Sequence, residues 1–140
     1  MGQQQLLLII LGVIIVGIAI AVGLQLFQAG SVGANQDAIV NDIMNIAAHA
    51  DQYRIRPSTM GGGDGEFVGY TLPQRLAETG NATYDEPEPA VTAETVTIVG
   101  VSKLHDGRIT LVYRPNPDPE TDDEQYDWSA TGVFEGAFGD

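Results

Sequence analysis

The sequence predicts an α+β protein in which a long N-terminal helix packs on the small antiparallel β-sheet of a head domain. Residues 6–27 are apolar, residues 39–53 repeat apolar side chains at helical spacing, and two β-rich segments flank Asp106-Gly107. The helix is therefore expected to be apolar on all sides in its first half and amphipathic in its second half.

The 140 residues leave room for one globular domain. We expect an apolar membrane and polymerisation helix at residues 1–34 and an acidic head at residues 35–140. Within the head, the expected order is a helix at 35–56, a loop and short helix at 57–94, and a sheet at 95–140.

Charge is confined to the expected head. The net charge is −13, and no charged side chain precedes Asp37. Such an acidic surface repels phosphates, which argues against nucleic-acid binding through a basic patch. The chain has no cysteine, so thiolate chemistry is excluded. The glycine loop at 61–65 lacks the Lys-Ser/Thr of a phosphate-binding loop. We expect neither a cofactor nor an enzyme activity.

The apolar run from Leu6 to Phe27 contains sixteen Leu, Ile, Val or Phe residues and one polar side chain, Gln25. As a helix it spans roughly 33 Å, which matches a hydrocarbon core. Insertion would gain roughly 5–10 kcal/mol before the costs of Gln25 and the glycines. A buried helix of a soluble domain is a weaker alternative, because a small head cannot cover every face. A secretory signal cleaved near Ala29-Gly30-Ser31 is a second alternative.

The amphipathic half follows Gly30, Ser31 and Gly33. Asn35 suits an N-cap, although the two halves can also join into one helix of about fifty residues. Ile39, Ile43, Ile46, Ala50 and Tyr53 lie on one face by 4-3-4-3 spacing. Pro57 ends the helix.

The remaining elements are predicted from turn residues. A short helix is expected at 72–79 with Thr71 as its cap. Asp106-Gly107 predicts a two-residue hairpin loop that places Leu104 opposite Ile109. A third strand is expected at 127–138.

Three features of the sequence are weak indications of a metal site, a catalytic site or a modification site. Carboxylates gather near the C-terminus and are candidate calcium ligands: Asp118, Asp122, Asp123 and Asp127. They lack the EF-hand pattern, and a solvated loop is the better interpretation. His49 and His105 have no partner pattern for a triad or a metal. Asn81-Ala82-Thr83 is a glycosylation sequon, a pattern that often occurs by chance.

The layout of apolar helix, amphipathic continuation, glycine loop and small sheet resembles type IV pilins and pilin-like filament subunits, in which a helix carries a compact head like a lollipop. Met1-Gly2-Gln3 before the apolar run is similar to a prepilin cleavage junction. The resemblance implies cleavage after Gly2 and methylation of Gln3. Leu7 stands where most members have a glutamate, and no cysteine pair closes a C-terminal loop.

The resemblance implies a homopolymer assembled through N-terminal helices from a precursor in the inner membrane, with a prepilin peptidase and assembly machinery as partners. The expected product is a cell-surface filament for adhesion or motility. A pseudopilin of a secretion system and a single-pass anchored binding domain are the alternatives. The expected polymerisation residues share the apolar helix: Leu6, Leu7, Ile10, Val13, Gly17, Ile20, Gly23 and Phe27.

Overall fold

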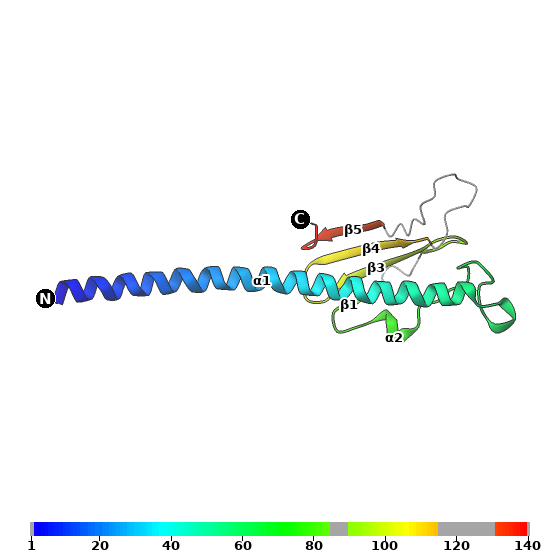
Figure 1. Ribbon diagram of the computed structural model, residues 1–140, viewed down its shortest axis with the longest axis horizontal. Coiled ribbons are helices and arrows are strands. Elements are labelled where there is room, and N and C mark those ends of the chain that lie inside the picture. The colour runs from blue at the N-terminus through cyan, green and yellow to red at the C-terminus, as the bar shows by residue number, and fades with distance from the viewer. Residues whose placement is uncertain (1, 85–89, 115–130, 140) are drawn as a thin grey trace. The chain divides into compact units, whose positions relative to one another are not determined.

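The computed structural model describes residues 2–84, 90–114 and 131–139. It confirms the α+β class, with a long apolar N-terminal helix and a small antiparallel sheet (Figure 1). The elements in order are α1 (Gly2–Ile55), the 3-10 helix η1 (Ser58–Met60), α2 (Gln74–Ala77), β1 (Ala82–Thr83), β2 (Ala90–Val91), β3 (Val96–Ser102), β4 (Gly107–Tyr113) and β5 (Thr131–Gly136). The chain forms two compact units, Met1–Ala34 and Asn35–Asp140.

Helix α1 is continuous for 54 residues, so the two halves join into one helix and Asn35 does not cap a second one. Gly30 and Gly33 cost about 1 kcal/mol each as helix interior residues, but neither blocks the hydrogen-bond ladder as proline would. Asn35 has another role. Its side chain is buried, and its Oδ1 accepts a hydrogen bond from Ser102 Oγ at 2.6 Å.

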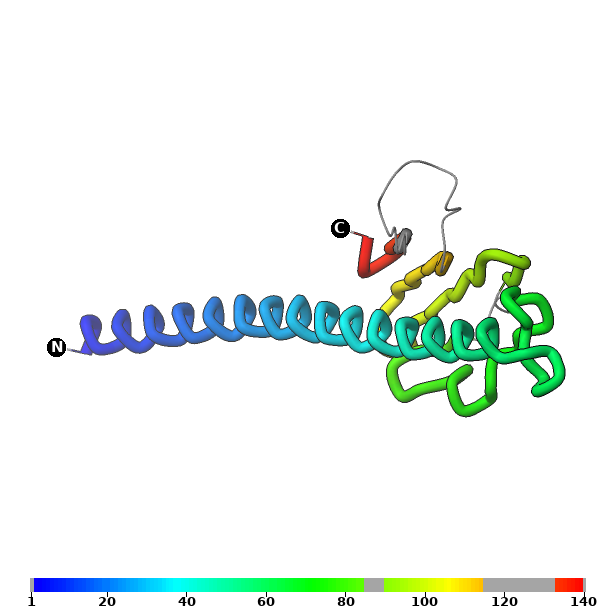
Figure 2. Tube along the Cα trace, turned by 45° about the vertical axis from the view of Figure 1, so that its right-hand side comes forward, coloured from blue at the N-terminus to red at the C-terminus, as the bar shows by residue number. Residues whose placement is uncertain are grey.

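The head core lies between α1 and the inner face of the sheet, meaning the face toward α1. Figure 2 shows residues 35–55 alongside β3 and β4. The predicted helix face is confirmed for Ile39, Ile43, Ile46 and Ala50, each at most 1 % exposed, whereas Tyr53 is only half-buried.

Gly100 on β3 allows this close packing. A Cβ at Gly100 would lie 2.8 Å from Ile39 Cγ2 and 2.9 Å from Tyr84 Cε1. No side chain larger than hydrogen fits there without a shift of the helix or of Tyr84. The approach of helix to sheet is therefore set at this glycine.

The sheet is antiparallel throughout, in the order β1-β3-β4-β5, with β2 also paired to β3. The predicted hairpin of β3 and β4 is present, but the predicted two-residue loop and the predicted register are both wrong. Ile109 lies opposite Gly100 instead of Leu104. The cause is Ser102, whose Oγ accepts hydrogen bonds from the backbone N–H groups of Leu104 and His105 and ends the strand early.

The register error changes pairing without changing faces. Gly100 and Leu104 are separated by an even number of residues, so the alternation of side chains is preserved. Ile98, Ile109 and Leu111 accordingly remain buried. Leu104, expected on the core side, lies in the wider turn and is 62 % exposed.

Two other predicted elements are shorter than expected. The helix at 72–79 is confined to α2, and Pro73, not Thr71, occupies its N-cap position. Glu78 is already extended and forms a bridge with Thr83. Within the expected third strand, β5 covers Thr131–Gly136, and residues 127–130 lie outside the described residues.

The glycine loop after η1 caps the C-terminal end of α1. Gly63 N–H donates to Tyr53 O at 2.9 Å, and Gly65 N–H donates to Arg54 O at 2.8 Å. These bonds satisfy carbonyl groups that every helix leaves unpaired at its end. A Cβ at Gly63 would lie 1.8 Å from Glu66 O, so the tight path of the loop requires glycine at this position.

We expect Gly100→Ala to lower the free energy of unfolding of the head by about 1–3 kcal/mol, because the added methyl overpacks the contact with Ile39 and Tyr84. Thermal and urea unfolding of the full chain in detergent would measure it. Gly80→Ala is the matched control, since a Cβ there meets nothing within 4 Å. Equal stability of the two variants would contradict this account of the core.

Candidate functional site

The N-terminal unit presents an uncovered apolar surface. All sixteen large apolar side chains from Leu6 to Phe27 are exposed, from 49 % at Val22 to 76 % at Phe27. Single exposed leucines are ordinary on a soluble protein, but a contiguous apolar surface of this extent marks a contact with lipid or protein. We call residues 6–27 the apolar surface.

This helix is long and apolar enough to cross a membrane, and none of its most hydrophobic window is buried. A soluble core helix would be mostly covered by its own domain, so that alternative does not fit the structure. A cleaved signal sequence passes the same test of length and composition. By length and composition, the N-terminal helix could therefore span a membrane.

The expected polymerisation residues all lie on the apolar surface. The six large ones, Leu6, Leu7, Ile10, Val13, Ile20 and Phe27, are 53–76 % exposed. A Cβ at Gly17 or Gly23 would meet nothing within 4 Å. Gly2 and Gln3 of the expected processing junction are helical and exposed. Residues 6–27 carry no side chain for acid–base or nucleophilic chemistry, so the contact this surface can make is one of packing.

A partly buried polar contact joins the amphipathic half of α1 to the segment that follows α2. Asp42 Oδ2 accepts hydrogen bonds from Thr79 Oγ1 at 2.9 Å and from Tyr84 OH at 2.8 Å. Tyr84 is fully buried, and this burial, followed by the bond to Asp42, raises the pKa of its hydroxyl. The sequence pattern does not single out Asp42, although its spacing from Ile39 and Ile46 puts it at the border of the buried face.

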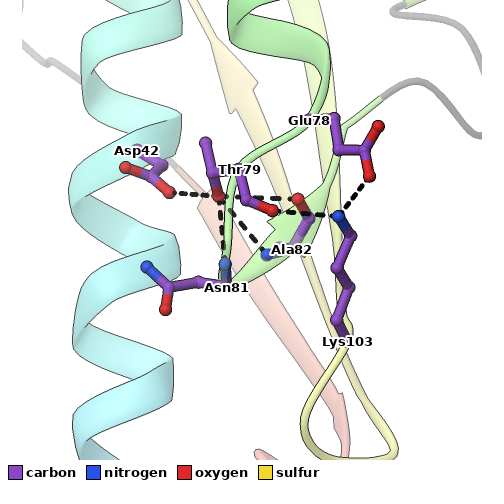
Figure 3. Close-up of polar contacts among 6 residues, drawn as sticks. All are labelled: Asp42, Glu78, Thr79, Asn81, Ala82 and Lys103. Carbon is purple, nitrogen blue, oxygen red and sulfur yellow. Dashed lines mark hydrogen bonds and ion pairs between the residues drawn. The ribbon is translucent and has the colours of Figure 1, made fainter.

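The turn after α2 is ordered by further contacts around Thr79 (Figure 3). Thr79 Oγ1 accepts from the N–H groups of Asn81 and Ala82 at 3.3 and 3.4 Å. Lys103 Nζ donates to Thr79 O at 3.0 Å and pairs with Glu78. The hydrogen bond and the charge of Lys103 lower the pKa of the exposed Glu78 carboxyl. Surface ion pairs contribute little stability, so Asp42 is the stronger anchor.

His49 has a structural partner. Its Nδ1 lies 3.1 Å from Tyr70 OH. Burial, and then the charges of Arg75 and Arg56, lower the pKa of His49. Burial raises the pKa of Tyr70 to about 12. The pair holds the segment before α2 against α1.

The structure adds no support for the weaker candidate sites, namely the calcium ligands and the glycosylation sequon. Asp118, Asp122, Asp123 and Asp127 lie outside the described residues. Among the described residues, no group of three or more His, Cys, Asp or Glu side chains could hold a metal ion. Asn81 of the sequon lies in the turn of Figure 3, partly exposed, with its backbone carbonyl accepting from Lys103 N–H.

We expect Asp42→Ala to lower the free energy of unfolding by about 1–3 kcal/mol, because it leaves the buried Tyr84 hydroxyl without its acceptor. Denaturant unfolding of the full chain in detergent measures the change. Asp51→Ala is the control, since it removes only the partly exposed pair with Arg54. Adding Tyr84→Phe to Asp42→Ala should recover part of the loss. An additive further loss would contradict the pairing.

The stability of the head should fall as the pH rises above about 10, the value for tyrosine in an unfolded chain. The direction of this change follows from the pKa of Tyr70, which the fold raises to about 12. As the pH rises, the Tyr70 hydroxyl loses its proton in the unfolded chain before it does so in the folded chain, so alkali favours unfolding. Melting temperatures between pH 8 and 12 would test this. A Tyr70→Phe variant with an equally steep decline would rule out a contribution from Tyr70.

No protein-family model, curated protein or solved structure matches the chain. The functional conclusion therefore rests on the apolar surface and on the contacts that anchor the head.

Proposed function

We propose that this chain is the structural subunit of an extracellular, type IV pilus-like helical filament used for adhesion or motility. The observation that supports this best is the apolar surface, whose sixteen large side chains the chain itself leaves exposed. Lipid can cover these side chains before assembly, and the helices of other copies can cover them afterwards.

The exchange from lipid to a helix bundle costs little hydrophobic energy, since both surroundings are apolar. Packing between helices, and their close approach at small residues, then decide whether the helix stays in lipid or joins the bundle. Gly12, Gly17 and Gly23 support this step, because among the described residues nothing beyond the adjoining turns of the helix lies within 4 Å of a Cβ placed there. A repeated head-to-tail contact that does not close into a ring produces a helical polymer.

The precursor is proposed to sit in the inner membrane through the same helix and to be cut between Gly2 and Gln3 by a prepilin peptidase. The charge distribution suits this arrangement, because the first charged side chain is Asp37, beyond the apolar run. An acidic head then remains in water while the uncharged helix stays in lipid.

A second candidate is a lone membrane-anchored domain that does not polymerise. The same exposed helix favours it, since one apolar helix is enough to anchor a head. A pseudopilin in a short envelope filament belongs to the same physical class as the proposed subunit and differs in the length and location of the polymer.

Microscopy of sheared cell-surface material, with intact mass of the chain in it, separates these functions. We expect filaments in which the chain has lost Met1 and Gly2 and gained one methyl group. Short polymers retained in the envelope would indicate a pseudopilin. A chain that starts near Ser31 would identify a cleaved signal, and a detergent-free monomer would end the filament proposal.

We expect Val16→Arg to abolish filaments, because arginine at the centre of the apolar run costs about 2.5–3.5 kcal/mol on insertion and leaves a charge unpaired in the bundle. Val16→Leu is the control and should assemble normally. Counting filaments in sheared material by negative stain, with immunoblots for total chain, measures the effect. Wild-type filament numbers in the arginine variant would contradict assembly through this helix.

A further inference from the structure

Within the head, α1 has a buried stripe on one side and an exposed face on the other. Ile39, Ile43, Ile46 and Ala50 form the stripe and are at most 1 % exposed. Seven exposed residues between positions 38 and 55 follow one another at steps of one, three or four, the spacing of a single helix face. We call them the outer helix face: Val40, Asn41, Met44, Asn45, Ala48, Gln52 and Ile55.

No member of the outer helix face carries a charge. The aspartates and the arginine of the same stretch each have a partner within the head. Asp42 accepts hydrogen bonds from Thr79 and Tyr84, and Asp51 pairs with Arg54. The water-facing side of an amphipathic helix normally collects charged side chains. An uncharged exposed face is therefore unexpected in a chain with 19 acidic residues.

The composition of the outer helix face is that of a contact surface. Val40, Met44 and Ile55 are 36, 53 and 66 % exposed, and protein interfaces are enriched in methionine and depleted of charge. Asn41 and Asn45 are poor helix formers, and neither side chain makes a hydrogen bond within residues 2–84, 90–114 and 131–139. Across a contact between helices, such amides can bind one another.

The partner of this face must itself be uncharged. A surface rich in carboxylates is unsuitable, because removing a carboxylate from water without a counter-charge is costly. Residues 1–36 of a second copy are suitable, since they contain no charged side chain and their large apolar side chains need a cover. Their polar side chains are amides apart from Ser31, and amides can bind amides.

We propose that the outer helix face receives the apolar surface of a second copy in the filament. This inference rests on the proposed filament function and names the part of the head that the neighbouring helix contacts. One copy supplies its apolar surface and the next supplies its outer helix face. The contact is therefore heterologous and continues along an open polymer. It removes no charged side chain of either surface from water, because neither surface carries one.

The chain has no cysteine, so one introduced cysteine reports on one position of the full chain. Met44→Cys tests the outer helix face. Met60→Cys is the matched control, since Met60 is also exposed and lies in η1, outside α1. Each variant is labelled with a water-soluble maleimide, first in detergent and then after assembly with an excess of wild-type chain by detergent removal. We expect assembly to slow labelling about tenfold or more in Met44→Cys, because the core of a contact excludes water, and to change it little in Met60→Cys.

Mixed assemblies identify the surface that covers Met44. Chains with Met44→Cys are assembled together with chains that carry one cysteine in the apolar surface, at each of its positions in turn, and a cysteine crosslinker is added. Every crosslink then joins two copies, because each chain has one cysteine. We expect mixed dimers with Met44→Cys at one or more positions of the apolar surface, and none when Met60→Cys takes its place.

Labelling of Met44→Cys that assembly does not slow would overturn the inference. Equal slowing in both variants would also overturn it, because enclosure in any dense polymer would then explain the result. Mixed dimers at no position, or crosslinks only between two Met44→Cys chains, would show that the apolar surface is not the partner. These results leave the filament proposal standing. A wild-type chain that never sediments without detergent would instead refute the filament itself.

Discussion

A surface of sixteen large apolar side chains that the chain does not cover is the constraint on which the rest depends. Water makes such a surface costly, at about 25 cal/mol for each Å², which favours a cover of lipid or of other apolar helices. The absence of charge before Asp37 keeps both surroundings accessible to it. In the proposed filament, assembly is an exchange between two apolar surroundings, and small differences in packing decide its direction.

The head domain has a different role, because it fixes the amphipathic half of the same helix in place. Gly100 lets Ile39 approach the sheet, and Asp42 fixes the buried Tyr84 hydroxyl and the turn at Thr79. The glycine loop satisfies the carbonyl groups at the end of α1. Packing, a buried hydrogen bond and a cap thus act on one face and one end of the helix.

Charge becomes important where the head domains of two copies would come close together. An acidic surface keeps free heads apart and soluble, and the same repulsion opposes a dense polymer. In the proposed filament, salt or bridging cations would have to offset this repulsion.

The sequence by itself determined the elements that follow from composition and period: the apolar run, the buried stripe of Ile39, Ile43 and Ile46, and the two long strands. These depend on side chains close in sequence, so a local pattern reveals them. Tertiary structure decided the rest. Ser102 shifted the hairpin by binding the backbone of its own turn, Asn35 turned from an expected cap into a partner of Ser102, and Asp42 met Tyr84 from 42 residues away. No local pattern reports contacts of this kind, since their energy depends on which distant groups the fold brings within reach.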